Sequence, residues 1–172
     1  MDTAQDKSTD DKPAALRRIL KNRDEIREYL AELAESAARE IMIFAPRLDG
    51  DLFNSARFAR ALASFAARHR HNHARIVVED AEQVLRDNDR VVELCRRLSD
   101  FIHLHQVGEE HLGIREMFVV VDHRGYLHQQ DLEKPDTIAH LHDARGAVLL
   151  VRRFNELWDR SEAIASQRTS GL

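Results

Sequence analysis

The residues with the clearest chemical potential lie between Arg115 and Asp122, where a short apolar stretch, residues 117–121, separates the two charged side chains. An arginine can clamp a phosphate or carboxylate with two parallel hydrogen bonds. Its guanidinium stays protonated at neutral pH, so Arg115 is not a usable nucleophile. Gln130 ends the next apolar segment, and we expect it to join Arg115 and Asp122 in binding a ligand. This group predicts anion binding rather than bond cleavage.

Histidine is abundant, with ten copies, and several pairs have spacings that can bind zinc. These pairs are His69 with His73, His103 with His105, and His140 with His142. None of them has a clear third ligand, so we expect no metal site and no cofactor. His111, four residues before Arg115, is the candidate for a displaced nucleophile if the protein is an enzyme, with Asp122 as its companion.

Carboxylates also follow the expected strands, where ligands bind in open α/β sheets. The residues concerned are Asp49, Asp51, Glu79, Asp80 and Asp122. Such a cluster could hold Mg²⁺, but acidic residues at strand ends also cap the next helix. We expect helix capping for Asp49, Asp51 and Asp80. The six glycines are scattered singly, which excludes a glycine-rich phosphate loop, and Cys95 lies in an apolar helical stripe that predicts a core position.

Hydrophobic periodicity predicts the elements that must position these side chains. Helices are expected at 13–37 with a break at Asn22 or Asp24, at 52–66, at 84–98, and from a cap at Asp143 to 158. Strands are expected at 40–45, 75–79 and 101–107, and a hairpin at 117–122 and 126–130 with Gly125 in its loop. Strands that alternate with helices pair in parallel through right-handed crossovers. We therefore expect an α/β fold with a mixed, mostly parallel sheet and helices on both faces.

This order of elements, the strand that ends in Asp122, and the helix with Phe154 and Trp158 resemble one repeat of the phospholipase D-like superfamily. The resemblance covers residues 39–158. The superfamily's motif has a His, a Lys two residues later and an Asp five residues after the Lys. Here Arg115 and Met117 occupy the first two positions, and only Asp122 matches. The resemblance thus implies a phospholipase D-like fold with a degenerate catalytic motif, and a homodimer through the edge that carries Arg115 and Asp122, because two repeats pair face to face in that superfamily.

The chain of 172 residues has the length of a single domain, which we expect at 14–160 between a disordered tail at 1–13 and a flexible tail at 161–172. A net charge of -4 gives no general attraction to polyanions, and the basic doublets lack interleaved aromatic residues, so nucleic acid is not an expected partner. One cysteine excludes an internal disulfide. The polar, acidic start of the chain is unlike a signal peptide, and the apolar runs are too short to span a membrane. We expect a cytoplasmic protein.

These observations favour a non-catalytic binding or regulatory module that forms a homodimer and recognises an anionic or phosphorylated small molecule. The alternative is a phosphodiesterase or nuclease with a rearranged site that uses His111 or the strand-end acids with a metal. A third hypothesis is a structural partner for another protein that binds through the first helix.

Overall fold

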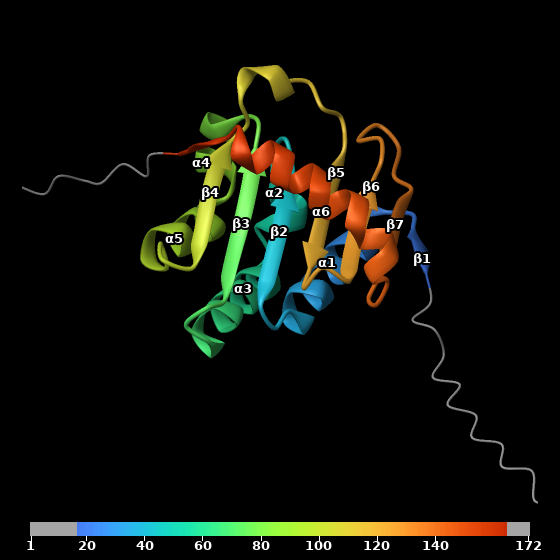
Figure 1. Cartoon of the computed structure of the whole chain (residues 1–172), viewed down its shortest axis with the longest axis horizontal. Coiled ribbons are helices and arrows are strands. Elements are labelled where there is room, and N and C mark those ends of the chain that lie inside the picture. Colours follow the sequence, from blue (N-terminus) through green and yellow to red (C-terminus); the bar gives the residue numbers. More distant parts are fainter. Residues whose placement is uncertain (1–16, 165–172) are drawn as a thin grey trace, which may run out of the picture.

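A mixed sheet of eight strands forms the centre of the protein in the computed structural model, which describes residues 17–164 (Figure 1). The strand order is β1-β7-β6-β5-β2-β3-β4-β8. The strands are β1 (Arg18–Leu20), β2 (Glu40–Phe44), β3 (His73–Val78), β4 (Ile102–Gln106), β5 (Met117–Val121), β6 (Gly125–Gln129), β7 (Thr137–His140) and β8 (Glu162–Ala163). Strands β2, β3 and β4 pair in parallel, and all other pairs are antiparallel. The expected mixed α/β class is confirmed, and the antiparallel share exceeds expectation because β1, β7 and β8 were not predicted.

Helices cover both faces of this sheet, as expected. The helices are α1 (Arg23–Ser36), α2 (Gly50–Phe53), α3 (Ala56–Arg68), α4 (Ala81–Asp87), α5 (Asp89–Arg97), the 3-10 helix η1 (Glu109–His111) and α6 (Ala144–Asp159). Helices α1 to α5 contribute to one apolar cluster, and α6 alone covers a second cluster on the opposite face. Figure 1 shows α6 crossing in front of the strands, with α1 and α3 behind them.

The segment predicted as one long first helix consists of a short strand followed by a helix. Asn22 caps α1 by accepting a hydrogen bond from the Glu25 amide at 2.9 Å, so the helix starts at Arg23. The residues just before Asn22 form β1, which pairs with β7. The prediction of helix for residues 18–20 was wrong because their backbone groups pair with a strand distant in the sequence, which periodicity cannot reveal.

Two other predicted helices are each divided in the structure. Asp49 caps only the short α2, and Ser55 caps α3. The expectation that Asp51 caps a helix was wrong, because Asp51 lies inside the first turn of α2. Asn88 ends α4 and precedes α5; it is fully buried and donates its side-chain amide to the Leu48 carbonyl oxygen at 2.6 Å. A buried Asn keeps this hydrogen bond by interrupting the helix. The predicted caps at Asp80 and Asp143 are confirmed.

The β5–β6 hairpin is confirmed, but its turn differs from the prediction. Asp122 and His123 have positive φ angles of 51° and 58°, whereas Gly125 is already in β6 opposite Val121. A Cβ atom on Gly125 would lie 2.9 Å from the Leu141 carbonyl oxygen, so glycine is needed there for close packing.

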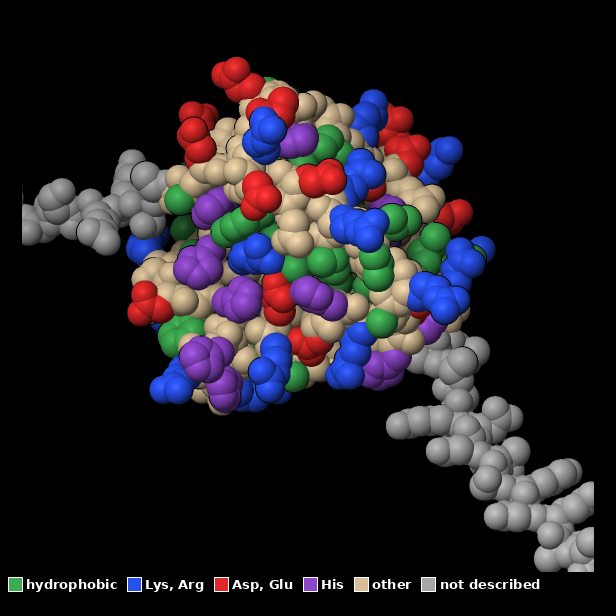
Figure 2. All heavy atoms as spheres, in the orientation of Figure 1, with side chains coloured by type: hydrophobic (Ala, Val, Ile, Leu, Met, Phe, Trp, Pro, Cys, Tyr) green, Lys and Arg blue, Asp and Glu red, His purple; other side chains and the backbone are tan. Residues whose placement is uncertain are grey.

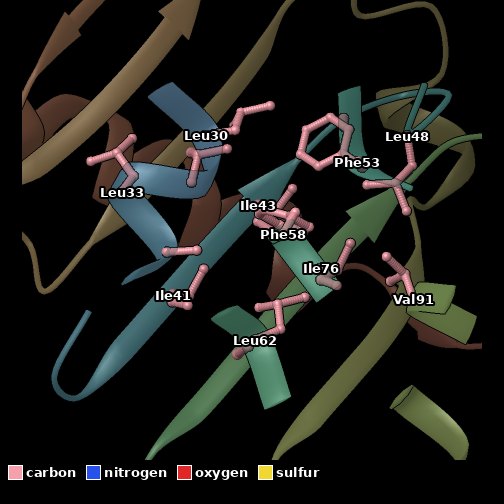
Figure 3. Close-up of a cluster of buried hydrophobic side chains, with 14 of the residues drawn as sticks. Leu30, Leu33, Ile41, Ile43, Leu48, Phe53, Phe58, Leu62, Ile76 and Val91 are labelled. Atoms are coloured by element: carbon pink, nitrogen blue, oxygen red, sulfur yellow. The ribbon is translucent and has the colours of Figure 1, made fainter. Parts of the chain in front are cut away.

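Helices α1 to α5 pack against the sheet in one continuous apolar cluster (Figure 3). Leu30, Leu33, Phe58 and Leu62 from α1 and α3 meet Ile41 and other residues of the central strands, and the side chains point toward one another. The folded region extends through β8 to Ile164, beyond the predicted boundary at 160. The tail expected at 1–13 lies outside the described residues, and so does the part of the tail expected at 161–172 that follows Ile164. Among residues 17–164, no helix is both long and apolar enough to cross a membrane.

Candidate functional site

A pocket of about 710 Å³ opens at the edge of the sheet where the parallel strands β2 and β3 end. Strand β5 runs antiparallel to β2, with Phe118 opposite Phe44, so the start of β5 lies at the same edge. Strand β6 ends there as well, with Gln129 opposite Met117. Four chain segments that are distant in the sequence therefore meet around one hollow of the size that small-molecule sites have.

The pocket combines an apolar lining with a rigid turn. Leu52 and Phe53 from α2 contribute buried apolar surface, and Met117 at the start of β5 is only 2% exposed. Leu48 lines the same side with a φ angle of 44°, a left-handed conformation that costs a leucine roughly 1–2 kcal/mol. The hydrogen bond from Asn88 to the Leu48 carbonyl oxygen holds this conformation. Such strain is typical of sites whose geometry is fixed before a ligand binds.

Each of the four carboxylates in the lining already accepts a hydrogen bond. Asp49 and Asp80 cap α2 and α4, and Asp49 also binds Arg23. Glu79 accepts from the Gly113 amide at 3.2 Å. Glu133 forms an ion pair with Arg115. Each carboxylate therefore already has a donor beside it, and within residues 17–164 no group of three or more potential metal ligands occurs.

The three arginines of the pocket differ in their partners. Arg23 is held by Asp49, and that hydrogen bond raises the pKa of Arg23 above its usual value. Among the described residues, Arg115 is paired only with Glu133, and both side chains are more than 60% exposed, so water screens the pair. Arg47 also lines the pocket, and within residues 17–164 its side chain makes no ion pair or hydrogen bond. Arg47 is thus the cation that a ligand can reach most easily.

The structure separates the residues that the sequence grouped with Arg115. Asp122 lies beyond the other end of β5, and the strand between the two residues is about 17 Å long (five residues at ~3.4 Å each). Its carboxylate accepts hydrogen bonds at 2.8–2.9 Å from the backbone amides of Ala38, Arg39 and Glu40, and so ties the β5–β6 turn to the start of β2. No single edge of the sheet therefore carries both Arg115 and Asp122.

Two further expected residues also fall outside the pocket. Gln130 is exposed beyond the end of β6, whereas the neighbouring Gln129 is buried, lines the pocket and donates to the Lys134 carbonyl oxygen at 2.8 Å. Successive side chains of a strand point to opposite faces, so Gln129 points into the pocket and Gln130 points away from it. His111 lies in η1 and is not part of the lining. Sequence reasoning missed Arg47 and Gln129, and only the spacing of Arg47 after the strand at 40–45 could have indicated the first of them.

Histidine pairs form no metal cluster in the described part of the chain, where no group of three or more potential ligands occurs. His103 and His105 do point to the same side of β4, as predicted. His105 stacks on Trp158 with ring centroids 3.7 Å apart and bonds Ser161 at 2.8 Å. Burial lowers the pKa of His105, and this environment fits a packing role.

Residues 22–169 match a family described as Domain of unknown function (DUF7931). The chain belongs to this family. No curated protein matches the sequence.

The fold is phospholipase D-like. Nuc from Salmonella typhimurium, a phospholipase D family member, superposes with a TM-score of 0.65 at 12% identity over 87% of this chain and 97% of Nuc. NucT from Helicobacter pylori gives 0.62 at 9% identity over 87% and 99%. TrmBL2, an archaeal chromatin protein with a novel mode of DNA binding, gives 0.64 at 14% identity over 86% of this chain, which spans only 53% of TrmBL2. Identities this low show a shared fold alone.

Proposed function

We propose that this DUF7931 domain is a non-catalytic, phospholipase D-like binding module whose pocket holds the anionic group of a small molecule. Arg47 and Arg115 are its cationic contacts, and the lining of Leu52, Phe53 and Met117 accepts an apolar part of the same ligand. The observation that carries the proposal is Arg47, which has no acidic partner within residues 17–164 although four carboxylates line the pocket.

The residues at the motif positions support binding without catalysis. Arg115 stands where the superfamily's motif has its nucleophilic histidine, and a guanidinium cannot attack phosphorus at neutral pH. Met117, in the place of the lysine, is buried and brings no charge. A ligand held here would therefore be recognised without its phosphorus–oxygen bond being cleaved.

A thermal-shift panel tests the proposal. Inorganic phosphate, a phosphodiester, nucleotides, short DNA and RNA are added to the wild type, Arg47→Ala and Arg115→Ala, with Arg97→Ala on α5 as the matched control because Arg97 is exposed and lies outside the pocket. A ligand at a hundred times its Kd adds about 2.7 kcal/mol of stability. Loss of one charged hydrogen bond, worth about 1.5 kcal/mol, weakens affinity roughly tenfold. We expect this loss in both pocket variants and an unchanged Kd in the control.

Two results would replace the proposal. A melting temperature that rises equally in all four proteins would place the anion outside this pocket. Turnover of the phosphodiester that disappears in His111→Ala or on chelation would favour the phosphodiesterase or nuclease alternative. DNA belongs in the panel because TrmBL2 binds it, although the net charge of -4 argues against a general affinity for polyanions.

A further inference from the structure

Helix α6 is exposed along its outer side. Within residues 17–164 it is the only helix that packs on its face of the sheet, through Ala147, Leu150, Phe154 and Leu157. Its opposite side faces solvent over the helix's full length of about 24 Å (16 residues at ~1.5 Å each). Because no other helix of residues 17–164 stands beside it, another molecule can approach this side directly (Figure 1).

Five exposed residues form a continuous stripe on this side, which we call the α6 seam: Arg145, Leu149, Arg152, Glu156 and Asp159. Their spacings alternate between four and three residues, as in the contact stripe of paired helices. Leu149 is 71% exposed, more than any other large apolar residue in the described chain, and Val148 beside it is 44% exposed. The seam therefore carries one strongly exposed apolar residue, with charged residues on both sides of it.

The charges of the α6 seam are segregated and unpaired. Arg145 and Arg152 lie in the N-terminal part, and Glu156 and Asp159 lie near the C-terminus. None of these four makes an ion pair within residues 17–164. By contrast, neighbouring arginines outside the seam are paired, Arg153 with Glu116 and Arg160 with Glu110. In Figure 2, acidic side chains lie toward the upper left of the diagonal that α6 follows, and basic and hydrophobic ones toward its lower right.

We propose that the α6 seam binds a second copy of this chain, with the two α6 helices antiparallel across a two-fold axis midway between Leu149 and Arg152. That axis places each Arg145 opposite Glu156 of the second copy, and each Leu149 against the aliphatic stem of the facing Arg152. A parallel arrangement would instead set like charges against each other. The seam is thus complementary to itself in one orientation only.

This dimer uses a different surface from the one that the sequence resemblance implied. Arg115 and Asp122 lie at opposite ends of β5, which is an interior strand, whereas the α6 seam is on the open face of the sheet. A single helix stripe buries less than the roughly 800 Å² per partner of a typical stable interface. We therefore expect a weak dimer that dissociates on dilution. The proposal is independent of anion binding in the pocket.

Charge reversal tests this proposal, because only pairing between two α6 seams predicts that single reversals weaken the dimer and that combining them restores it. Sedimentation velocity of the full chain over a concentration series gives the dimer Kd for the wild type, Arg145→Glu and Glu156→Arg. Each reversal puts like charges together at both symmetry-related contacts, so we expect the Kd of each variant alone to rise at least about tenfold. An equimolar mixture of the two variants restores both attractive contacts, and so does the double variant. Both should dimerise close to the wild-type Kd.

The reversals should not weaken the helix itself. Arg145→Glu places a carboxylate in the first turn of α6, and Glu156→Arg places a cation in the last turn; the helix dipole favours both changes. Circular dichroism melts confirm that each variant is folded, and Arg97→Glu on α5 controls for a general change in net charge. A wild type that is monomeric throughout the concentration series would overturn the proposal. A dimer Kd that is unchanged in both single variants would also overturn it, and so would an equimolar mixture that does not restore dimerisation.

Discussion

Asp122 is predicted to stabilise the fold rather than to bind a ligand, and replacing it separates these roles. Its carboxylate accepts three backbone hydrogen bonds, from Ala38, Arg39 and Glu40. Each is worth about 1 kcal/mol. Asp122 also has a φ angle of 51°, where alanine loses about another 1 kcal/mol relative to Asp or Asn.

Asp122→Ala removes all of these contributions, for a sum of about 4 kcal/mol. Water can replace part of the bonding because two of the three amides are exposed, so we expect a loss of about 2–4 kcal/mol. Asp122→Asn keeps one acceptor oxygen and tolerates the positive φ angle. It should lose about 1–2 kcal/mol.

Urea denaturation measures both free energies of unfolding, and for a chain of this size the melting temperature should fall by roughly 2–4 °C per kcal/mol. Binding of any pocket ligand should be unchanged, because Asp122 lies at the far end of β5 from the pocket. An Asp122→Ala protein as stable as the wild type, or one that is stable but no longer binds the ligand, would refute this reasoning.

Three further predictions concern other charged or reactive groups. Glu133→Gln should tighten anion binding by about 2–5-fold in a titration, since it releases Arg115 from an exposed ion pair worth less than about 1 kcal/mol. Burial raises the pKa of Glu40, but the hydrogen bond and charge of Arg75 outweigh it and the net pKa is lowered from 4.5. The stability that Glu40 contributes is therefore full above about pH 4.5 and is lost as pH falls through the lower pKa of the folded state. In urea denaturation at a series of pH values, Glu40→Gln should reduce the fall in the free energy of unfolding at acid pH. Burial raises the pKa of Cys95 to about 12, so little thiolate forms at neutral pH, and a thiol reagent should label this half-buried cysteine much more slowly than it labels the urea-unfolded chain.

Much of the central architecture could be predicted from local patterns. The apolar run that forms β2, the alternation of β4, and the hairpin of β5 and β6 are visible because burial imposes a period on the residues of each strand. The cap at Asp143 and the apolar side of α6 were predictable for the same local reason. The short strands β1, β7 and β8 were not, because each is stabilised by pairing with a distant segment rather than by its own apolar content.

The candidate site was predicted in part. The sequence by itself determined that the strands carry buried apolar residues and that α6 is amphipathic, because these properties depend on residue type and short spacing alone. The assignment of Arg115 and Met117 to motif positions is an expectation from the sequence resemblance. Only the tertiary structure decided that Arg115 meets Arg47 around the pocket while Asp122 anchors the opposite end of β5. That outcome depends on strand direction and register, which are fixed by contacts between segments far apart in the chain.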